Sequence, residues 1–429
     1  MKTGLKQTCH APDTHGPYVD QVTLPRTLPQ QLEVLRNATL PDGSVVDVVI
    51  AGGTVTALGP AGSAVPAADP AAELDLTGFL LLTAPAEPHA HLDKALSWDE
   101  IEPPLGDLAA AVESWIAHTT TVTSAEIAAR ARRQALHMLA HGTTAIRSHV
   151  DLLRNGDPLR GVHALLQVRA ELAGVMDIQL VALGSDVVDE SVYEAALDAG
   201  IDLVGGAPHM AADPIAELHR ELGIAKRRGV PVDLHTDESL SGPITLDEYA
   251  RAVRDWTQPC TAGHCVRLGT LEPDELDRIV AEVAASDIGI VSLPITNLYL
   301  QGWASPVSTP RGLTALRALL EAGVRVAAGA DNVRDPFNPV GRSDALETAS
   351  LLVTAGHLTL REAIHLVTDG ARSVMSLPPA GPVPGAKAEL LAVHGHNLSE
   401  VVASASPERH VIHEGRLVAT SLLDRQLAL

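Results

Sequence analysis

Eight apolar segments recur along the middle of the chain, and Ala/Leu-rich helical patterns separate most of them. Buried strands that alternate with helices are typical of parallel β-α units, and eight such units in roughly 290 residues are what a TIM barrel requires. A doubly wound open sheet is the competing architecture, but no Gly-x-Gly-x-x-Gly motif follows the first strand. The clearest helical patterns cover residues 124–140, 158–172, 214–228 and 273–285. The expected strands are 79–85, 143–149, 178–183, 203–207, 231–235, 261–264, 288–293 and 325–330.

Short alternating segments at both ends of the chain predict a second, smaller domain. Turn signals at Pro41-Asp42-Gly43 and Gly52-Gly53 separate the first group of segments, and Glu414-Gly415 divides the last group. We expect the two groups to pair into one small β-sandwich. The predicted organisation is an arm over 1–28, the small domain over 29–83 and 379–429, and the barrel over 84–378.

Composition narrows the classes of partner. The 429 residues are 46% hydrophobic but only 2% aromatic, so the core must be built from Ala, Leu, Val and Ile. A net charge of −22 without a Lys/Arg cluster argues against nucleic acid and anionic membranes as partners. No apolar signal segment and no membrane-spanning run is visible, and three cysteines make no disulfide framework. We therefore expect a cytoplasmic protein, with a homo-oligomer left open.

Histidines and carboxylates gather where the predicted strands end. His89 and His91 stand two apart after the first strand, and residues two apart on a strand point to the same face. His235 ends the fifth strand, His264 the sixth, and Asp331 follows the eighth. Active sites of TIM barrels lie at the carboxyl ends of the strands. The set therefore predicts one site at that end of the barrel.

This donor set predicts a divalent metal ion. Three imidazoles and a carboxylate suit Zn²⁺ or Fe²⁺, and the residues do not choose between them. A bound cation lowers the pKa of its water to about 7, which makes a nucleophile available near neutrality. Hydrolysis also needs a carboxyl group that carries protons, and Glu238 lies three residues past His235.

The same segments resemble the amidohydrolase superfamily, and within it the cytosine deaminase branch with triazine aminohydrolases such as N-isopropylammelide amidohydrolase. The likeness extends from about residue 32 to residue 420. The matching motifs are Glu87-Pro88-His89-Ala90-His91-Leu92-Asp93, Arg147-Ser148-His149-Val150-Asp151, Asp233-Leu234-His235-Thr236-Asp237-Glu238, Thr261-Ala262-Gly263-His264, Asn297-Leu298-Tyr299-Leu300-Gln301-Gly302 and Ala330-Asp331-Asn332-Val333-Arg334-Asp335-Pro336.

The resemblance implies roles for the central residues. It implies one metal ion with four protein ligands, with Glu238 as the proton shuttle and His264 as a catalytic residue that orients the attacking water and helps to deprotonate it. Asp331 would serve both as ligand and as proton acceptor. Superfamily members with two metals carry a lysine after strand four, and residues 205–209 contain none. The implied ligands are His89, His91, His235 and Asp331.

Three departures from the family pattern concern the substrate. Ser185 stands where cytosine deaminases have a glutamine that reads the pyrimidine amide edge. Asn332 replaces a second carboxylate, and Phe337 replaces a tryptophan. Because a pocket without the amide reader discriminates against the ligand that needs it, we expect poor binding of cytosine.

The remaining candidates surround the site. His209, Asn297 and Gln301 are expected to contact substrate, although His209 could equally be a loop residue and the other two could only pin a loop. Asp93 and Asp237 are expected to hydrogen-bond the ligand histidines, and His149 to stand behind the ligands, to touch substrate or to belong to the structural core.

The sequence thus predicts a metal-dependent aminohydrolase. Its substrate would be a small amino-substituted N-heterocycle, a pyrimidine, triazine or related ring, whose exocyclic C–N bond is hydrolysed by metal-activated water. One alternative is hydrolysis of a cyclic amide or imide ring by the same nucleophile. A more remote alternative is a non-catalytic scaffold, which conflicts with the presence of all the expected ligands and the shuttle.

Overall fold

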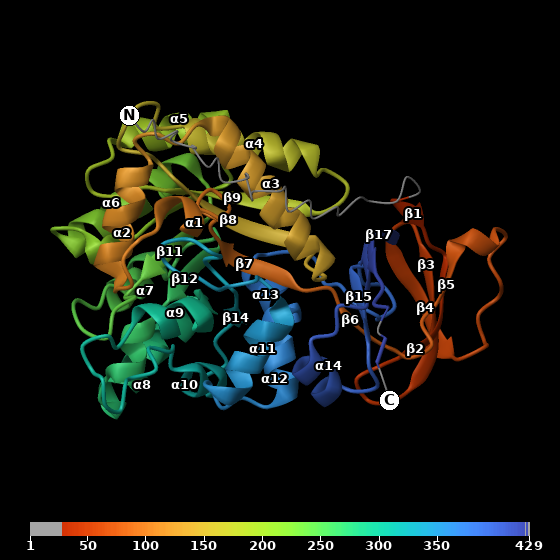
Figure 1. The fold of residues 1–429 in the computed structure, drawn as a ribbon. Helices are drawn as coiled ribbons and strands as arrows, with labels where there is room; N and C mark the ends of the chain where they lie inside the picture. Colours follow the sequence, from red (N-terminus) through yellow and green to blue (C-terminus); the bar gives the residue numbers. More distant parts are fainter. Residues whose placement is uncertain (1–27, 425, 428–429) are drawn as a thin grey trace, which may run out of the picture.

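The computed structural model describes residues 28–424 and 426–427, so the predicted arm lies outside the described residues except for Leu28. Two bodies make up the described part, a large barrel and a small β domain at its side (Figure 1). None of the helices in the described ranges has the length and apolarity that a membrane crossing needs.

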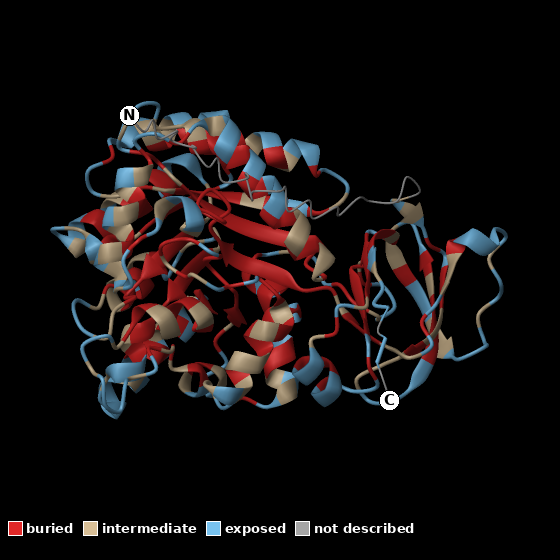
Figure 2. Ribbon diagram, viewed as in Figure 1, coloured by how far each residue is buried: buried red, intermediate tan, exposed pale blue. Residues whose placement is uncertain are grey.

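The barrel is an eight-stranded sheet in which every neighbouring pair is parallel and the strands follow their order in the chain. Figure 2 shows its strands buried at the centre and exposed faces on the helices around them. This arrangement confirms the predicted TIM barrel. The strands are β7 (Ala86–Ala90), β8 (Ala145–Asp151), β9 (Asp177–Leu183), β10 (Leu203–Gly206), β11 (Val232–Thr236), β12 (Cys260–His264), β13 (Gly289–Ser292) and β14 (Val326–Ala328).

Local sequence explains where the helices begin and end. Thr123 and Glu126 form a capping box at the start of α3, and Asp213 caps α6, which ends at Gly229 with a φ of 66°. The helices are α1 (Trp98–Ile101), α2 (Leu108–His118), α3 (Ser124–Ala140), α4 (Arg160–Glu171), α5 (Glu190–Ala199), α6 (Pro214–Arg228), α7 (Leu246–Val253), α8 (Pro273–Ala285), α9 (Pro294–Leu300), α10 (Leu316–Glu321), α11 (Ala345–Thr354), α12 (Leu360–Val367), α13 (Asp369–Val374) and α14 (Leu398–Ser404).

The barrel closes where β7 meets the segment after β14. Ala90 and Asp331 form an isolated parallel bridge at this seam. The buried Glu87 carboxylate accepts the backbone N–H of Ala330 (2.9 Å) and of His89 (3.2 Å). The first and last strands are thereby joined directly beside the residues predicted to bind metal.

The small domain is a nine-stranded, mostly antiparallel sheet to which both ends of the described chain contribute. Its core combines side chains from the two ends, among them Leu35, Val48, Leu390 and Ile412. The predicted joining of the chain ends is confirmed. The strands are β1 (Gln30–Gln31), β2 (Val34–Thr39), β3 (Val45–Ala51), β4 (Thr54–Pro60), β5 (Glu73–Asp75), β6 (Phe79–Thr83), β15 (Leu390–His394), β16 (Arg409–His413) and β17 (Arg416–Ser421).

One strand prediction was wrong. The apolar run 79–85 contains β6, which pairs with β15 in the small domain and is not the first barrel strand. That strand is β7, in which Glu87, Pro88 and His89 interrupt the apolar pattern. The run correctly indicated a buried strand, but apolar character does not tell which sheet a strand joins.

A buried ion pair fastens the two bodies together. Arg409 of β16 is 1% exposed and donates to both oxygens of Asp344, at 3.0 and 2.8 Å. It also donates to the backbone oxygen of His141, at 2.6 Å. Asp344 in turn caps α11 by accepting the backbone N–H of Leu346.

Removing this arginine should destabilise the protein strongly. Arg409→Met leaves a buried carboxylate without its partner, and we expect a loss of about 3–5 kcal/mol in the free energy of unfolding. Arg251→Met is the control, because its ion pairs with Asp247 and Glu248 within α7 are partly exposed and should contribute about 1 kcal/mol or less. Urea unfolding followed by circular dichroism measures the unfolding midpoint of each variant, and equal midpoints would contradict the predicted difference in stability.

Candidate functional site

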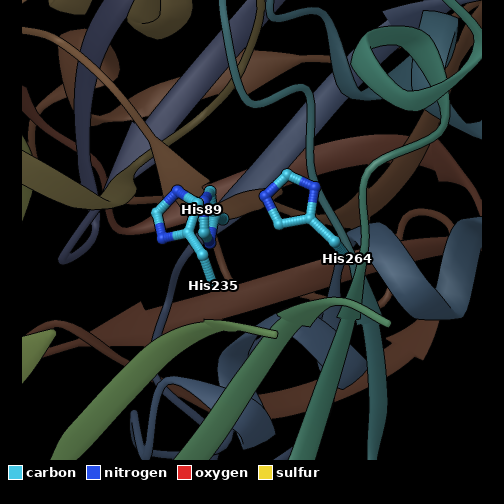
Figure 3. A group of neighbouring side chains, drawn as sticks. All are labelled: His89, His235 and His264. Atoms are coloured by element: carbon cyan, nitrogen blue, oxygen red, sulfur yellow. The ribbon is translucent and has the colours of Figure 1, made fainter. Parts of the chain in front are cut away.

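The carboxyl ends of three barrel strands and the segment after β14 supply the predicted site. His89 lies in β7 and His91 directly after it, His235 lies in β11, and His264 is the last residue of β12. Asp331 lies three residues after β14. All five are buried at the carboxyl end of the barrel. Figure 3 shows the rings of His89, His235 and His264 gathered in one place.

The predicted ligand atoms converge. His235 Nε2 lies 3.1 Å from His89 Nε2 and 3.1 Å from His91 Nε2. Asp331 Oδ1 lies 3.3 Å from His91 Nε2 and 3.9 Å from His89 Nε2. Donors held about 2.0–2.1 Å from a tetrahedral centre stand about 3.3 Å apart. The observed spacing therefore fits a divalent cation.

The donor chemistry leads to the same conclusion. A ring nitrogen has either one N–H or one in-plane lone pair, so His235 Nε2 can make only one good hydrogen bond to its two imidazole neighbours. A cation would instead accept a lone pair from each of the three rings. The residues present thus fit the group that the sequence predicts.

Burial sets the protonation of these groups. Burial, followed by the charge of neighbouring cationic groups, lowers the pKa values of His89, His91 and His235 well below the ordinary value. Burial and then the nearby Glu238 raise the pKa of Asp331 well above its usual range. Neutral imidazole is the form that binds metal, and a cation would compensate the buried carboxylate.

Glu238 and His264 lie next to each other, beside the predicted ligands. Glu238 Oε1 lies 3.5 Å from His264 Nδ1, and burial raises the pKa of Glu238 to about 8. The amide Nδ2 of Asn297 donates to the same His264 Nδ1 at 3.0 Å. Because this nitrogen accepts, neutral His264 carries its proton on Nε2, which lies 4.0 Å from Asp331 Oδ2.

Two of these residues adopt a strained backbone conformation. His264 has a φ of 66° and Asp331 a φ of 61°, in the left-handed region that residues with a Cβ rarely adopt. Such strain costs of order 1–3 kcal/mol and persists where surrounding structure enforces it. His264 ends β12 and Asp331 lies three residues after β14, and both turn their side chains toward the predicted metal position.

A cavity of about 210 Å³ lies over this cluster. His91, His235, His264, Glu238 and Asp331 line it, together with the predicted substrate residues Ser185, Asn332 and Phe337.

Neighbouring side chains hold the three residues that depart from the family pattern. Ser185 Oγ accepts from Arg154 at 3.1 Å. Asp335 holds the other two, because its carboxylate accepts from Asn332 Nδ2 and from the backbone N–H of Phe337 at 2.8 and 2.9 Å.

Three other predicted substrate residues do not line the cavity. His209 Nδ1 donates to the backbone oxygen of His235 at 3.1 Å, and Gln301 Nε2 donates to that of Glu238 at 2.7 Å. Asn297 binds His264 as described. These three side chains hydrogen-bond residues of the site from outside the cavity lining. Their predicted contact with substrate stays a prediction.

The expected carboxylate partners of the ligand histidines bind elsewhere. Asp237 accepts from Thr245 and Leu246 and so fixes the start of α7, and Asp93 accepts the backbone N–H of Asp151. Their positions explain the difference, because both follow the strand ends and turn into the adjacent loops. The His149 ring lies against the His89 ring, with centroids 4.1 Å apart and ring planes tilted by 35°.

Sequence analysis missed the opposite wall of the cavity. Helix α2 covers it with Leu108, Val112, Trp115 and Ile116, followed by its C-cap Thr119, and their spacing places them on one helix face. Lys94 and Asp151 also line the cavity, 2.6 Å apart. The helical spacing was readable in the sequence, but nothing in it indicated that this face covers the site.

Known proteins resemble this chain over nearly all its length. Pterin deaminase of Rhizobium rhizogenes is 31% identical over 421 residues, which cover 91% of this chain and 94% of that protein. The structure of 5-methylcytosine deaminase from Klebsiella pneumoniae, liganded with phosphonocytosine, superposes with a TM-score of 0.84 at 26% identity, covering 92% of this chain and 100% of that one.

A third relative is N-isopropylammelide isopropylaminohydrolase from Burkholderia multivorans, with a TM-score of 0.78, 29% identity, and coverage of 90% of this chain and 99% of that one. The model of the amidohydrolase family matches residues 120–419. The match spans well over half of the chain. The chain therefore belongs to the amidohydrolase family.

Proposed function

We propose that this protein is a metal-dependent aminohydrolase that removes an amino or alkylamino group from a small N-heterocycle. One observation carries the proposal: the donor atoms of His89, His91, His235 and Asp331 converge beside Glu238 in a cavity. The names of the relatives support the same reaction class, since they include a pterin deaminase, a 5-methylcytosine deaminase and an isopropylaminohydrolase.

His89, His91, His235 and Asp331 would hold the metal ion. His and Asp donors suit Zn²⁺ and Fe²⁺, and we propose one of these two. When bound, such an ion lowers the pKa of water enough to supply a nucleophile near neutral pH. No lysine follows β10, where the chain runs Gly205-Gly206-Ala207-Pro208-His209, which supports a single ion.

Glu238 and His264 would manage the protons. Burial keeps Glu238 protonated at neutral pH, so that it can donate to the ring nitrogen beside the reacting carbon. It then takes one proton of the attacking water and passes it to the leaving amine. Asp331 would accept the second water proton and return it to Glu238, so that the two protons end on the ring nitrogen and the amine and both carboxyl groups regain their starting forms. Nε2–H of His264 would orient the water and stabilise the negative charge that develops on its oxygen; because this nitrogen already carries a proton, it would not take the water proton that the resemblance assigned to it.

Ammonia release distinguishes this reaction from its rival. The rival is opening of a cyclic amide or imide, which the same residues could catalyse. Pterin, cytosine, 5-methylcytosine and N-isopropylammelide form a suitable panel, in which the last releases isopropylamine instead of ammonia. Release of the amine from any of them supports the proposal. Ring-opened product from lactams, with no amine from the panel, would replace it with the rival.

We further propose that the protein works in the cytoplasm. The two cysteines in the described part of the chain, Cys260 and Cys265, are buried free thiols, which fits a reducing compartment.

We also propose domain boundaries at 83/84 and 378/379. The end of β6 at Thr83 and the start of β15 at Leu390 support them.

Replacement of the proton shuttle should abolish most turnover. Glu238→Gln keeps the size of the side chain but cannot give up a proton, and we expect kcat to fall about 10²- to 10⁴-fold with metal content unchanged. Glu347→Gln, a half-buried glutamate paired with Arg342 outside the cavity, is the control. Turnover of Glu238→Gln at the wild-type rate would contradict the assignment.

Replacement of a ligand should remove the metal. His235→Ala lacks one of the four predicted donors. Because metal affinity depends on all the donors and on the residues that hold them, we expect the metal content to fall from one ion per chain to below about one tenth. Elemental analysis after gel filtration measures this content. His219→Ala, an exposed histidine on α6, should retain one ion. Full metal content in His235→Ala would refute the ligand set.

A further inference from the structure

The cavity contains an ion pair that the chemistry described above does not use. Lys94 Nζ lies 2.6 Å from Asp151 Oδ1, and both residues line the cavity. The indole N–H of Trp115 donates to the other oxygen, Asp151 Oδ2, at 2.6 Å. The Lys94 side chain is 4% exposed and that of Asp151 is 19% exposed. Burying such a pair costs desolvation energy that a core of apolar side chains would avoid.

Lys94 retains at least one N–H group that the protein does not bind. An ammonium has three N–H donors, and Asp151 takes one. Asp93 Oδ2, at 3.7 Å, lies beyond hydrogen-bond range. His91 Nδ1, at 3.4 Å, takes at most a second. At least one N–H donor of Lys94 therefore remains for a ligand.

The position of the pair suits recognition of a ring. Its ammonium lies 5.5 Å from the centroid of Trp115 and 6.0 Å from that of Phe337, and both rings line the cavity. Nζ also lies 3.4 Å from His91 Nδ1, and the opposite nitrogen of that ring, Nε2, is the predicted metal donor. The width of one imidazole ring therefore separates Nζ from the predicted metal position. A substrate attacked there would present its neighbouring ring atoms to Lys94 and Asp151.

The charges indicate which group is read. Two carboxylates, Asp93 and Asp151, lie within 4 Å of the Lys94 ammonium, so an anionic substituent placed at this pair would meet no net positive charge. Arg154, the other cation in the cavity lining, lies at Ser185 instead. A donor beside an acceptor instead complements a lactam, whose oxygen and N–H nitrogen are about 2.2 Å apart. Ser185, which stands where cytosine deaminases have a glutamine, already accepts a hydrogen bond from Arg154.

We propose that Lys94 and Asp151 read the lactam edge of the substrate, with Lys94 donating to the ring oxygen and Asp151 accepting from the adjacent ring N–H. The substrates are then amino-substituted heterocycles that also carry an oxo group next to a ring N–H. This inference rests on the proposed function for the reaction, but the recognition itself can be measured by binding alone.

The test uses two matched pairs of probes. Pterin and isocytosine contain the lactam edge, while 2-aminopteridine and 2-aminopyrimidine are the same amino-substituted rings without the oxo group. Calorimetry with the metal-loaded protein gives Kd for all four, and amine release gives kcat/KM. We expect the wild type to prefer the lactam member in at least one pair, since a site built for a hydrogen bond rejects a ligand without that group.

Lys94→Met keeps the apolar stem and removes the donor. We expect the affinity and kcat/KM for the lactam probe to fall about 10- to 100-fold, the loss typical of a hydrogen bond to a charged group, with less than about threefold change for its partner. Asp151→Asn should give the same pattern. The matched control is Lys226→Met, because Lys226 also lies over a tryptophan, Trp256, but outside the cavity lining.

The outcomes separate the inference from the proposed function. Binding preference for the lactam without amine release would refute the aminohydrolase and leave the reader intact. Equal losses on both members of a pair would show that Lys94 acts through His91 or the fold, and would overturn the inference. Absence of any lactam preference in the wild type would overturn it as well.

Discussion

The closure of the barrel is the constraint on which the site depends. His89 and His91 come from the end of the first strand and Asp331 from the segment after the last, so these predicted ligands meet only if the two ends of the sheet join. The Ala90–Asp331 bridge and the Glu87 carboxylate make that joint. A Cβ at Gly329 would lie 2.1 Å from Glu87 Oε1, so glycine is needed for the carboxylate to fit. Fold and site are thus secured by the same contacts.

Burial supplies the chemistry that this closure brings together. The imidazoles stay neutral and Glu238 stays protonated for one reason, the removal of water from charged forms. The same burial would disfavour the carboxylate of Asp331, which makes a cation the natural partner of the set. The left-handed backbone at His264 and Asp331 adds strain, which the strand pairing and the seam sustain.

The residues of this site that lie at strand ends could be predicted from the sequence. His89, His91, His235 and Asp331 could be predicted to converge, because the carboxyl ends of parallel strands meet at one end of a barrel. The assignment of 79–85 to the barrel failed because a buried strand looks the same in either sheet. The partners of Asp93 and Asp237 could not be predicted, because loop direction decides them.

The cavity wall was hidden for a different physical reason. Lys94 follows the ligand motif in sequence, yet its partner Asp151 is 57 residues away and Trp115 lies on a helix between them. Only the folded chain shows that one carboxylate receives both donors. In the proposed function the predicted metal ligands would fix the reaction, since any heterocycle attacked there would meet the same nucleophile and Glu238. Selectivity must therefore come from groups that touch the rest of the ring, and a desolvated donor–acceptor pair discriminates more steeply than apolar walls.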